Sequence, residues 1–464
     1  MSLINILKSS VFSTPLTHQW SSLLSTDQQA LFDLCFTINR FTHQSFLYQL
    51  LPLCWSFDPH TTLKLIFYLR DYRGQGERKP FYFALTWLSQ FHPTTFLQIV
   101  PLVPSYGYYK DLFIFFGTAF ENEILDLLVT QLQKDKEALS SGQNISLVAK
   151  WLPTEGSFYD RKYRLVSKIC KKLKISKSTY RKDYLTSLRA SLPLIERHLS
   201  SKSYHLINPA TVPIIALHRY SKNLIQHGIK FSPQLYFTKP EQMFHFYLTK
   251  NMYQPLIELL WRNYLSTNRF SPNLFVVLDT SDSMKYHKFF PLKRSLLLLF
   301  SFGSLWSPLS LRPNFSPITG NSLFDQINNI LNSRTRSTGN IDLTIYLLDL
   351  LESEQIPETL LFLSDLTFNF ATSLTDFSLF PSIFDRYRQK ALQPPSIIFW
   401  TLTKKYMSVS LLYNIIILEG YNPLIYSLIL KRLKTPIDTK TFLSDLYTDI
   451  VNHSRYDPLD VVTI

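Results

Sequence analysis

Residues 273–283 read NLFVVLDTSDS, and this stretch decides the fold of the second half of the chain. Its first seven residues form a short, β-branched apolar run, which predicts a buried strand ending at Asp279. The following residues complete a D-x-S-x-S pattern, in which the turn after the strand directs Asp279, Ser281 and Ser283 at one point. Carboxylate and hydroxyl oxygens suit Mg²⁺ or Mn²⁺, so the stretch predicts a strand followed by a divalent-cation site.

Further apolar runs alternate with helical patterns around this stretch. Strands are expected at ETLLFLSD (358–365), SIIFWTLT (396–403) and NIIILEG (414–420), and helices at 290–302, 326–333, 341–353 and 422–433. Buried strands that alternate with helices predict a doubly wound, parallel α/β sheet over residues 266–464. Because the carboxyl ends of parallel strands meet at one edge, Asp365 is expected beside Asp279 as a further ligand.

This arrangement resembles the metal-ion-dependent adhesion site of von Willebrand factor A domains. The resemblance implies a threonine ligand from a loop of the form G-N-T-D, and the corresponding segment here, residues 337–342, reads STGNID. An ungapped comparison puts Ile341, which cannot ligate a metal, at the threonine position, whereas a shifted loop would supply Thr338. The alternative is a loop that binds no metal and only caps the following helix.

Residues 1–265 are expected to be helical. Apolar residues recur at helical spacing in successive segments, among them HQSFLYQLLPLCW (43–55), TTLKLIFYLRDY (61–72) and ENEILDLLVTQLQ (121–133). Only 11 of the 464 residues are glycine, which disfavours arrays of tight β-turns. The prediction is therefore a HEAT-like solenoid or ring of helix pairs in residues 1–265, followed by the A-like domain in residues 266–464.

The positive charge of the chain belongs to its helical part. The chain holds 48 Lys and Arg against 34 Asp and Glu, and residues 1–265 account for 30 and 17 of these. Residues 160–189 alone contain eleven Lys and Arg but two Asp. Such a concentration predicts binding to a polyanion.

A helix over Arg161–Leu173 would sort this stretch into an apolar face and a cationic face. The apolar face holds Leu165, Val166, Ile169, Cys170 and Leu173. The candidate phosphate-binding residues are Arg161, Arg164, Lys168, Lys171, Lys172, Lys174, Lys177, Arg181 and Lys182. The alternatives are a solvated face, a face paired with acidic groups elsewhere, and a membrane-surface role.

Several segments of the helical part resemble one known family. They are LRDYRGQGER (69–78), YGYYKDL (106–112), KWLP (150–153), YRK (180–182) and Val212-Pro213, in this order. Together they look like an uncharacterised family of plants, fungi, bacteria and giant viruses. Its members pair a helical domain of the TROVE type, related to that of the Ro autoantigen, with a von Willebrand A-like domain. The resemblance covers residues 25–460 and implies RNA binding by helical repeats closed into a ring by the A-like domain.

The segment at 69–78 alternates in charge beside two glycines. The favoured interpretation is an ion-pair network that braces a helix–helix corner, formed by Arg70, Asp71, Arg73, Glu77 and Arg78. The alternative is an anion-binding loop.

Composition excludes several other functions. No glycine is followed by Lys, so there is no Walker A loop, and neither G-x-S-x-G nor H-E-x-x-H occurs. The three cysteines, Cys35, Cys54 and Cys170, contain no C-x-x-C pair, which argues for a reducing compartment. No signal-peptide pattern is visible, and the apolar stretch 295–311 is interpreted as a buried helix and loop rather than a membrane span. A cytoplasmic protein is expected.

The leading hypothesis is a non-enzymatic RNA-binding protein with structured RNA as its partner, a Mg²⁺ or Mn²⁺ ion in the A-like domain and no small-molecule substrate. The alternative is a protein-interaction scaffold, whose metal would bind a carboxylate of an acidic partner. A metal-dependent phosphoryl-transfer or hydrolytic enzyme is disfavoured, because no general base or nucleophile accompanies the predicted ligands.

Overall fold

The structure is a computed structural model. It describes residues 26–40, 42–71, 74–192, 195–208, 212, 214–229, 258, 274–280, 284, 295–296, 299, 305–309, 313–332, 340–341, 343–353, 356–364, 369–370, 379–390, 392–401, 408–412, 415–419 and 442–463. The chain divides into two compact units. We call residues 27–207 with 447–464 the helical unit, and residues 1–26 with 208–446 the sheet unit. The boundary expected at 265/266 lies outside the described residues.

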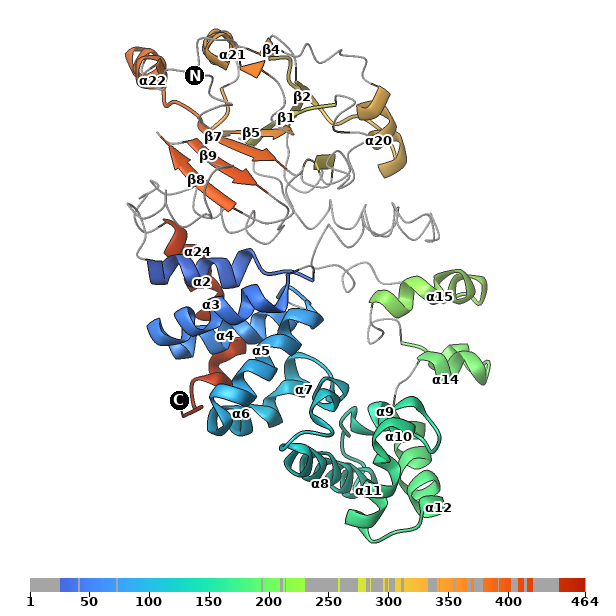
Figure 1. Ribbon diagram of the computed structural model, residues 1–464. Coiled ribbons are helices and arrows are strands. Elements are labelled where there is room, and N and C mark those ends of the chain that lie inside the picture. The colour runs from blue at the N-terminus through green and yellow to red at the C-terminus, as the bar shows by residue number, and fades with distance from the viewer. Residues whose placement is uncertain are drawn as a thin grey trace. The chain divides into compact units, whose positions relative to one another are not determined.

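The helical unit consists of short helices that follow one another closely (Figure 1). Its elements are α2 (Thr26–Phe36), α3 (Gln44–Phe57), α4 (Pro59–Arg70), α5 (Arg78–Phe91), α6 (Pro93–Ile99), η1 (Val100–Leu102), α7 (Val103–Tyr106), η2 (Tyr109–Phe115), α8 (Glu121–Ser140), α9 (Val148–Trp151), α10 (Phe158–Tyr163), α11 (Leu165–Leu173), α12 (Lys177–Thr179), η3 (Tyr180–Thr186), α13 (Ser187–Ser191), α14 (Ile195–Ser200), η4 (Tyr204–Leu206) and η8 (Ser454–Leu459). Consecutive helices α3, α4 and α5 pack on one another.

Local sequence explains these helices. Helix α4 begins where Asp58 accepts a hydrogen bond of 3.0 Å from the Thr61 amide and Pro59 occupies the first turn. The side chains that face inward, such as Leu63, Ile66 and Phe67, are fully buried. The three cysteines are buried and free, and burial raises the pKa of the Cys35 and Cys54 thiols. They are therefore packing residues rather than reactive groups.

The sheet unit is built on a seven-stranded sheet with the order β3-β2-β1-β5-β7-β9-β8. Its strands are β1 (Leu274–Leu278), β2 (Leu305–Pro308), β3 (Ser316–Pro317), β5 (Thr359–Ser364), β7 (Ser396–Thr401), β8 (Ser408–Leu412) and β9 (Ile415–Glu419). The five central strands are parallel, whereas β3 and β8 pair antiparallel at the two edges. The order confirms the predicted fold class, a helical part followed by a doubly wound, mostly parallel sheet.

Both faces of strands β1, β5 and β7 are buried, as a doubly wound sheet requires. On one face, Tyr346 and Leu350 of α21 (Leu343–Leu351) and Tyr387 of α22 (Leu379–Gln389) pack against Phe362 and Phe399. In Figure 1 these two helices lie above the orange strands. The described part of this unit also holds α15 (Ile214–Gln226), α20 (Leu323–Asn332) and the short pair β4 (Asn340–Ile341) and β6 (Asn369–Phe370).

Two features differ from the sequence analysis. Residues 305–308 form strand β2, although 295–311 was expected to be a helix and a loop; the pairing of Trp306 with Val276 in register extends the parallel sheet here. The C-terminal residues 447–464, with the end of α24 (Phe442–Val451) and η8, belong to the helical unit by their contacts. No local sequence pattern indicated that residues 447–464 belong with the helical unit. In the described part of the chain, no helix is long and apolar enough to cross a membrane.

Candidate functional site

The basic stretch forms a series of short helices, not the single helix predicted over Arg161–Leu173. Helix α10 ends and α11 begins at Arg164, whose φ of 52° is left-handed. The break has a local cause, because Asp160 accepts hydrogen bonds from the Val166 amide at 2.9 Å and the Gly156 amide at 2.8 Å. This carboxylate therefore starts a new helix where the apolar pattern alone predicts continuity.

The apolar face of α11 is buried as predicted. Leu165, Val166, Ile169 and Cys170 are all buried, and Leu173 is half-buried. This face packs in the helical unit, with α8 as a neighbour of α11. The arrangement leaves the cationic side chains of the stretch on the outside.

Three of the nine predicted phosphate-binding residues are already paired with carboxylates. Lys168 binds Glu121 and Lys172 binds Asp126, both on α8, and Lys177 lies 2.6 Å from Glu155. The hydrogen bond from Lys168 lowers the pKa of Glu121, so this carboxylate is ionised at neutral pH. Pairing with acidic groups, one of the alternatives left open by the sequence, thus holds for these three lysines.

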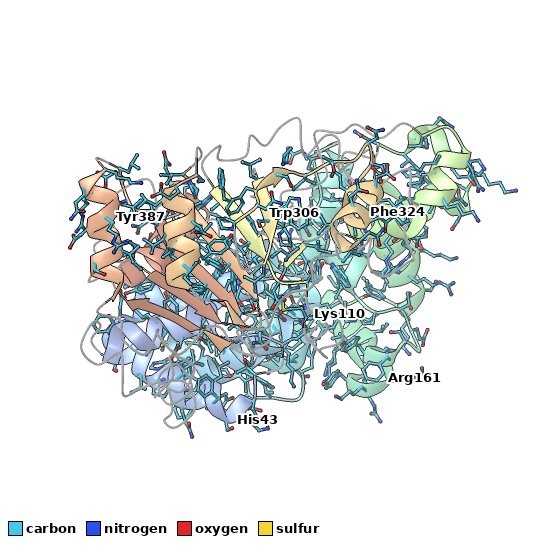
Figure 2. The ribbon with its side chains drawn as sticks, turned by 90° about the horizontal axis from the view of Figure 1, so that it is seen from above. His43, Lys110, Arg161, Trp306, Phe324 and Tyr387 are labelled. Atoms are coloured by element: carbon cyan, nitrogen blue, oxygen red, sulfur yellow. The ribbon has the colours of Figure 1, made fainter. Side chains whose placement is uncertain are left out.

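The other six cations are exposed, and none has a carboxylate partner among the described residues. We call them the open cation set: Arg161, Arg164, Lys171, Lys174, Arg181 and Lys182. Arg161 lies at the outer edge of the green helices in Figure 2. Arg164 and Lys174 both adopt left-handed backbone conformations, at φ 52° and 56°, in positions that glycine fills at lower cost. The chain thus has cations at two helix ends where glycine would be less strained.

The charged residues of the segment at 69–78 form ion pairs, but with partners outside the segment and not with one another as predicted: Arg70 and Arg78 pair with Asp111, and Glu77 pairs with Arg40. Asp111, which is completely buried, accepts hydrogen bonds from Arg70 Nε at 2.7 Å and Arg78 Nε at 3.2 Å. The Tyr82 hydroxyl donates to the same carboxylate at 2.6 Å, and burial together with this bond raises the pKa of Tyr82. At Gly107, an added Cβ would lie 2.4 Å from an Asp111 carboxylate oxygen, so only glycine fits there. Arg73 lies outside the described residues.

Sequence reasoning missed two residues that bind a carboxylate of this segment, Arg455 and Tyr456. Arg455 donates two hydrogen bonds to the fully buried Asp71, one of them 3.0 Å long from Nη2, and the Tyr456 hydroxyl lies 3.2 Å from the same carboxylate. The Tyr456 ring stacks on that of Tyr106 at 5.7 Å. A buried aspartate in the 69–78 segment implies a cationic partner, but nothing local to either segment identifies Arg455 as that partner.

Of the five predicted metal ligands, Asp279 lies within the described residues. It follows β1 directly, its amide donates to Leu363 O of the neighbouring strand β5, and it is 3% exposed. The Ser364 hydroxyl at the end of β5 donates to Asp279 Oδ2 at 2.7 Å. Ser281, Ser283, Thr338 and Asp365 lie outside the described residues. Among the described residues, no three or more His, Cys, Asp or Glu side chains lie together in a group that could hold a metal.

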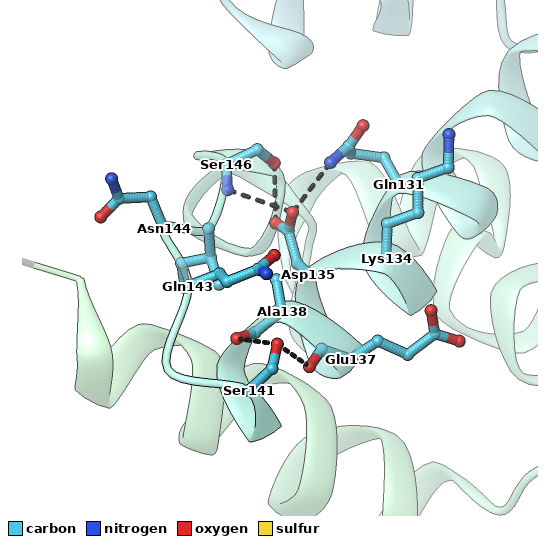
Figure 3. Close-up of a pocket in the computed structure, with 10 residues that line it drawn as sticks. Gln131, Lys134, Asp135, Glu137, Ala138, Ser141, Gln143, Asn144 and Ser146 are labelled. Carbon is cyan, nitrogen blue, oxygen red and sulfur yellow. Dashed lines mark hydrogen bonds between the residues drawn. The ribbon is translucent and has the colours of Figure 1, made fainter.

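A polar hollow at the C-terminal end of α8 has a structural explanation (Figure 3). Asp135 lies in its wall and accepts hydrogen bonds from Gln131 Nε2 at 2.8 Å, the Ser146 amide at 3.1 Å and the Ser146 hydroxyl at 2.7 Å. The buried carboxylate therefore fixes the loop after α8 onto the helix. We assign no ligand to this hollow.

Comparison with known proteins places these observations in a family context. The family model for a domain of unknown function, DUF2828, matches residues 17–125 and 118–235. An uncharacterised protein of Acanthamoeba polyphaga mimivirus is 26% identical over 321 residues. That alignment covers 58% of this chain and 56% of the relative, so the chain matches little more than half of the relative's length.

Among solved structures, the crystal structure of the Ro protein of Deinococcus radiodurans is similar. It shares 13% sequence identity with a TM-score of 0.44, over 90% of this chain and 99% of that one. The resemblance indicated by the sequence motifs, to an uncharacterised family with giant-virus members, is confirmed by the family model and the mimivirus relative. Residues 17–235 of this chain thus match the family defined by the domain of unknown function DUF2828.

Proposed function

We propose that the chain is a non-enzymatic RNA-binding protein whose helical unit binds RNA phosphates through the open cation set. The observation that supports this most directly is six exposed cations, from Arg161 to Lys182, with no carboxylate partner among the described residues. A face that served solubility alone would mix both signs of charge. Within the same stretch, Lys168, Lys172 and Lys177 do have carboxylate partners, so the two groups of cations have different roles.

The physical basis is counterion release. Each phosphate neutralised by Lys or Arg releases condensed cations from the RNA, so affinity falls steeply with salt. If all six open cations bind phosphates, affinity for RNA should fall about a thousandfold between roughly 50 and 200 mM salt. The paired lysines contribute less, because phosphate must first displace a carboxylate from each of them.

Filter binding of a structured RNA hairpin at these two salt concentrations tests the proposal. Changing Lys171, Lys174, Arg181 and Lys182 together to Glu is expected to weaken binding at low salt by at least about a hundredfold and to flatten the salt dependence. The matched control replaces the paired Lys168, Lys172 and Lys177 with Gln, and a much smaller loss is expected. Weak, salt-independent binding that the Glu substitutions leave unchanged would contradict the proposal.

Two further variants in this experiment separate binding from folding. Arg164→Gly and Lys174→Gly remove a cation and also relieve a left-handed backbone, which stabilises the fold by about 1 kcal/mol each. RNA affinity should therefore fall while the melting temperature is unchanged or higher. A general unfolding effect would move both measurements downward together.

We also propose that Asp279 ligates a divalent cation at the carboxyl end of β1. Two observations support a cation here: the carboxylate is buried, and the Ser364 hydroxyl orients it from the adjacent strand. Oxygen ligands of this type fit Mg²⁺ or Mn²⁺, and Ser281, Ser283, Asp365 and Thr338 would complete the set. A cation with an open position there could receive a carboxylate from an acidic protein partner, which is the second candidate function.

Isothermal titration with Mg²⁺ and Mn²⁺ tests this second proposal. The unmodified protein should release binding heat, Asp279→Ala should abolish it, and Ser364→Ala should weaken the affinity about 10- to 100-fold. Asp385→Ala removes an exposed carboxylate of α22 and should change nothing. The absence of binding heat in the unmodified protein would rule out a metal-dependent partner site.

A further inference from the structure

Helix α10 is unusual in what it leaves exposed. Three of its six residues are aromatic, Phe158, Tyr159 and Tyr163, yet none of its residues is buried. The Phe158 side chain is 64% exposed, more than any other phenylalanine among the described residues. Tyr159 and Tyr163 are half-buried, so Phe158 is the ring of this helix that is most available to a partner.

Cations stand directly beside these rings. The Lys110 amine lies 5.2 Å from the centre of the Tyr159 ring, and the Lys162 amine lies 4.9 Å from that of Tyr163. Phe158 stands perpendicular to Tyr159 at 5.2 Å, an edge-to-face contact that fixes its orientation. Phe113, in the core, supports Tyr159 from the other side with a second edge contact of 5.0 Å.

A second pair of aromatic rings also has cations beside it, and one of its members, Tyr108, is close in sequence to Lys110. Tyr108, which is 43% exposed, contacts Trp151 with 4.7 Å between ring centres. The Arg70 guanidinium lies 4.8 Å from the Tyr108 ring centre, and the Lys150 amine lies 5.7 Å from that of Trp151. Since Arg70 is held by the buried Asp111, the Tyr108 ring rests on a rigid support.

We propose that these rings form a stacking surface for unpaired nucleobases of the bound RNA. We call Tyr108, Phe158, Tyr159 and Tyr163 the ring surface. This inference rests on the proposed function: the open cation set, which begins at Arg161 on the same helix, holds the phosphates. The rings receive the faces of the bases, and the adjacent lysines keep the surface attractive to the nearby phosphates. A blunt duplex offers no free base faces along its length, so the preferred ligand is RNA with single-stranded nucleotides.

The charge of the surface favours RNA over a protein partner. The acidic residue of α10, Asp160, is occupied in capping α11. The charged groups that lie over the rings of α10 are the amines of Lys110 and Lys162, which attract an anionic ligand and not a basic peptide. Stacking on rings within a cationic field is the arrangement by which proteins hold single-stranded nucleic acids.

The test compares a single-stranded oligoribonucleotide with a blunt RNA duplex of equal phosphate number, both bound to the full chain at low salt. The single strand carries the fluorescent base 2-aminopurine, whose emission is quenched when it stacks. Phe158→Ala should weaken single-strand binding about tenfold and reduce the quenching, with duplex binding unchanged. Phe158→Trp keeps a ring and should retain both signals. Phe57→Ala, which removes another exposed phenylalanine on α3, should have no effect.

The outcomes separate this inference from the proposed function. Equal affinity for both RNAs, with no effect of Phe158→Ala on quenching, overturns the stacking surface and leaves phosphate binding intact. Failure of the unmodified protein to bind either RNA overturns both.

Discussion

Asp111→Asn is expected to destabilise the helical unit by about 3–5 kcal/mol, the largest effect of any single substitution considered for this chain. Asn keeps the shape of the side chain but removes its charge. Its amide NH₂ group would also face the donors Arg70, Arg78 and Tyr82, whose hydrogen bonds Asp111 now accepts. Arg70, whose side chain is 6% exposed, would then be a buried cation without a counter-charge. Guanidinium denaturation followed by far-UV circular dichroism measures the loss, because most of the helices among the described residues belong to this unit.

The matched control is Asp126→Asn. Asp126 also pairs with a cation, Lys172, but its side chain is 61% exposed, so water replaces the lost contact at a cost of less than about 1 kcal/mol. If the two substitutions destabilised the protein equally, burial would not be the source of the Asp111 effect, and the ion-pair network would have no special structural role.

The sheet unit was largely predictable because buried parallel strands have a direct sequence signature. Strands β1, β5, β7 and β9 fall within the apolar runs at 273–279, 358–365, 396–403 and 414–420. Strands β1, β5 and β7 are covered on both faces, so nearly every position is apolar and the run stands out from its surroundings. Strand β2 was missed, because its four residues, LWSP, follow an apolar stretch that reads as a buried helix.

The candidate RNA surface was predictable in composition but not in geometry. The sequence gives the number of cations in the basic stretch and the apolar face of α11, and both agree with the structure. It does not show which cations have partners, because Glu121 and Asp126 lie on α8, more than forty residues earlier. The break at Arg164 was also missed, since it depends on one carboxylate, Asp160, accepting two amides.

Apart from Tyr108, Arg181 and Lys182, the motif residues that indicate the family and the residues proposed to function are different sets. Arg70, Arg78, Gly107 and Asp111 belong to the matched segments, and all of them take part in one buried or half-buried network. Each of these residues helps to maintain the fold, and a shared fold does not by itself indicate an activity. The open cation set instead faces outward, where substitution leaves the core unaffected.

The C-terminal segment gives the second large expected effect, from Arg455→Ala. Arg455 reaches the fully buried Asp71 across 384 residues of sequence, and its Nη2 also donates to Ser105 O at 3.1 Å. Removing it deletes the two hydrogen bonds that the buried Asp71 carboxylate accepts from Arg455, at an expected cost of about 2–4 kcal/mol. The estimate lies below that for Asp111 because the Arg455 side chain is 20% exposed. Guanidinium denaturation of the full chain, followed by far-UV circular dichroism, measures this loss of stability.

Two variants show whether the cost of Arg455→Ala comes from the lost contact with the buried Asp71 or from a general loosening of residues 447–464. Lys64→Ala breaks the other ion pair of the segment, to the half-exposed Asp460, and should cost less than about 1 kcal/mol. Arg455→Lys keeps the charge but loses the two-pronged contact, so an intermediate loss is expected. Equal losses for Lys64→Ala and Arg455→Ala would mean that residues 447–464 are held by many weak contacts. A much larger loss for Arg455→Ala would mean that one buried carboxylate, Asp71, holds the end of the chain on the helical unit.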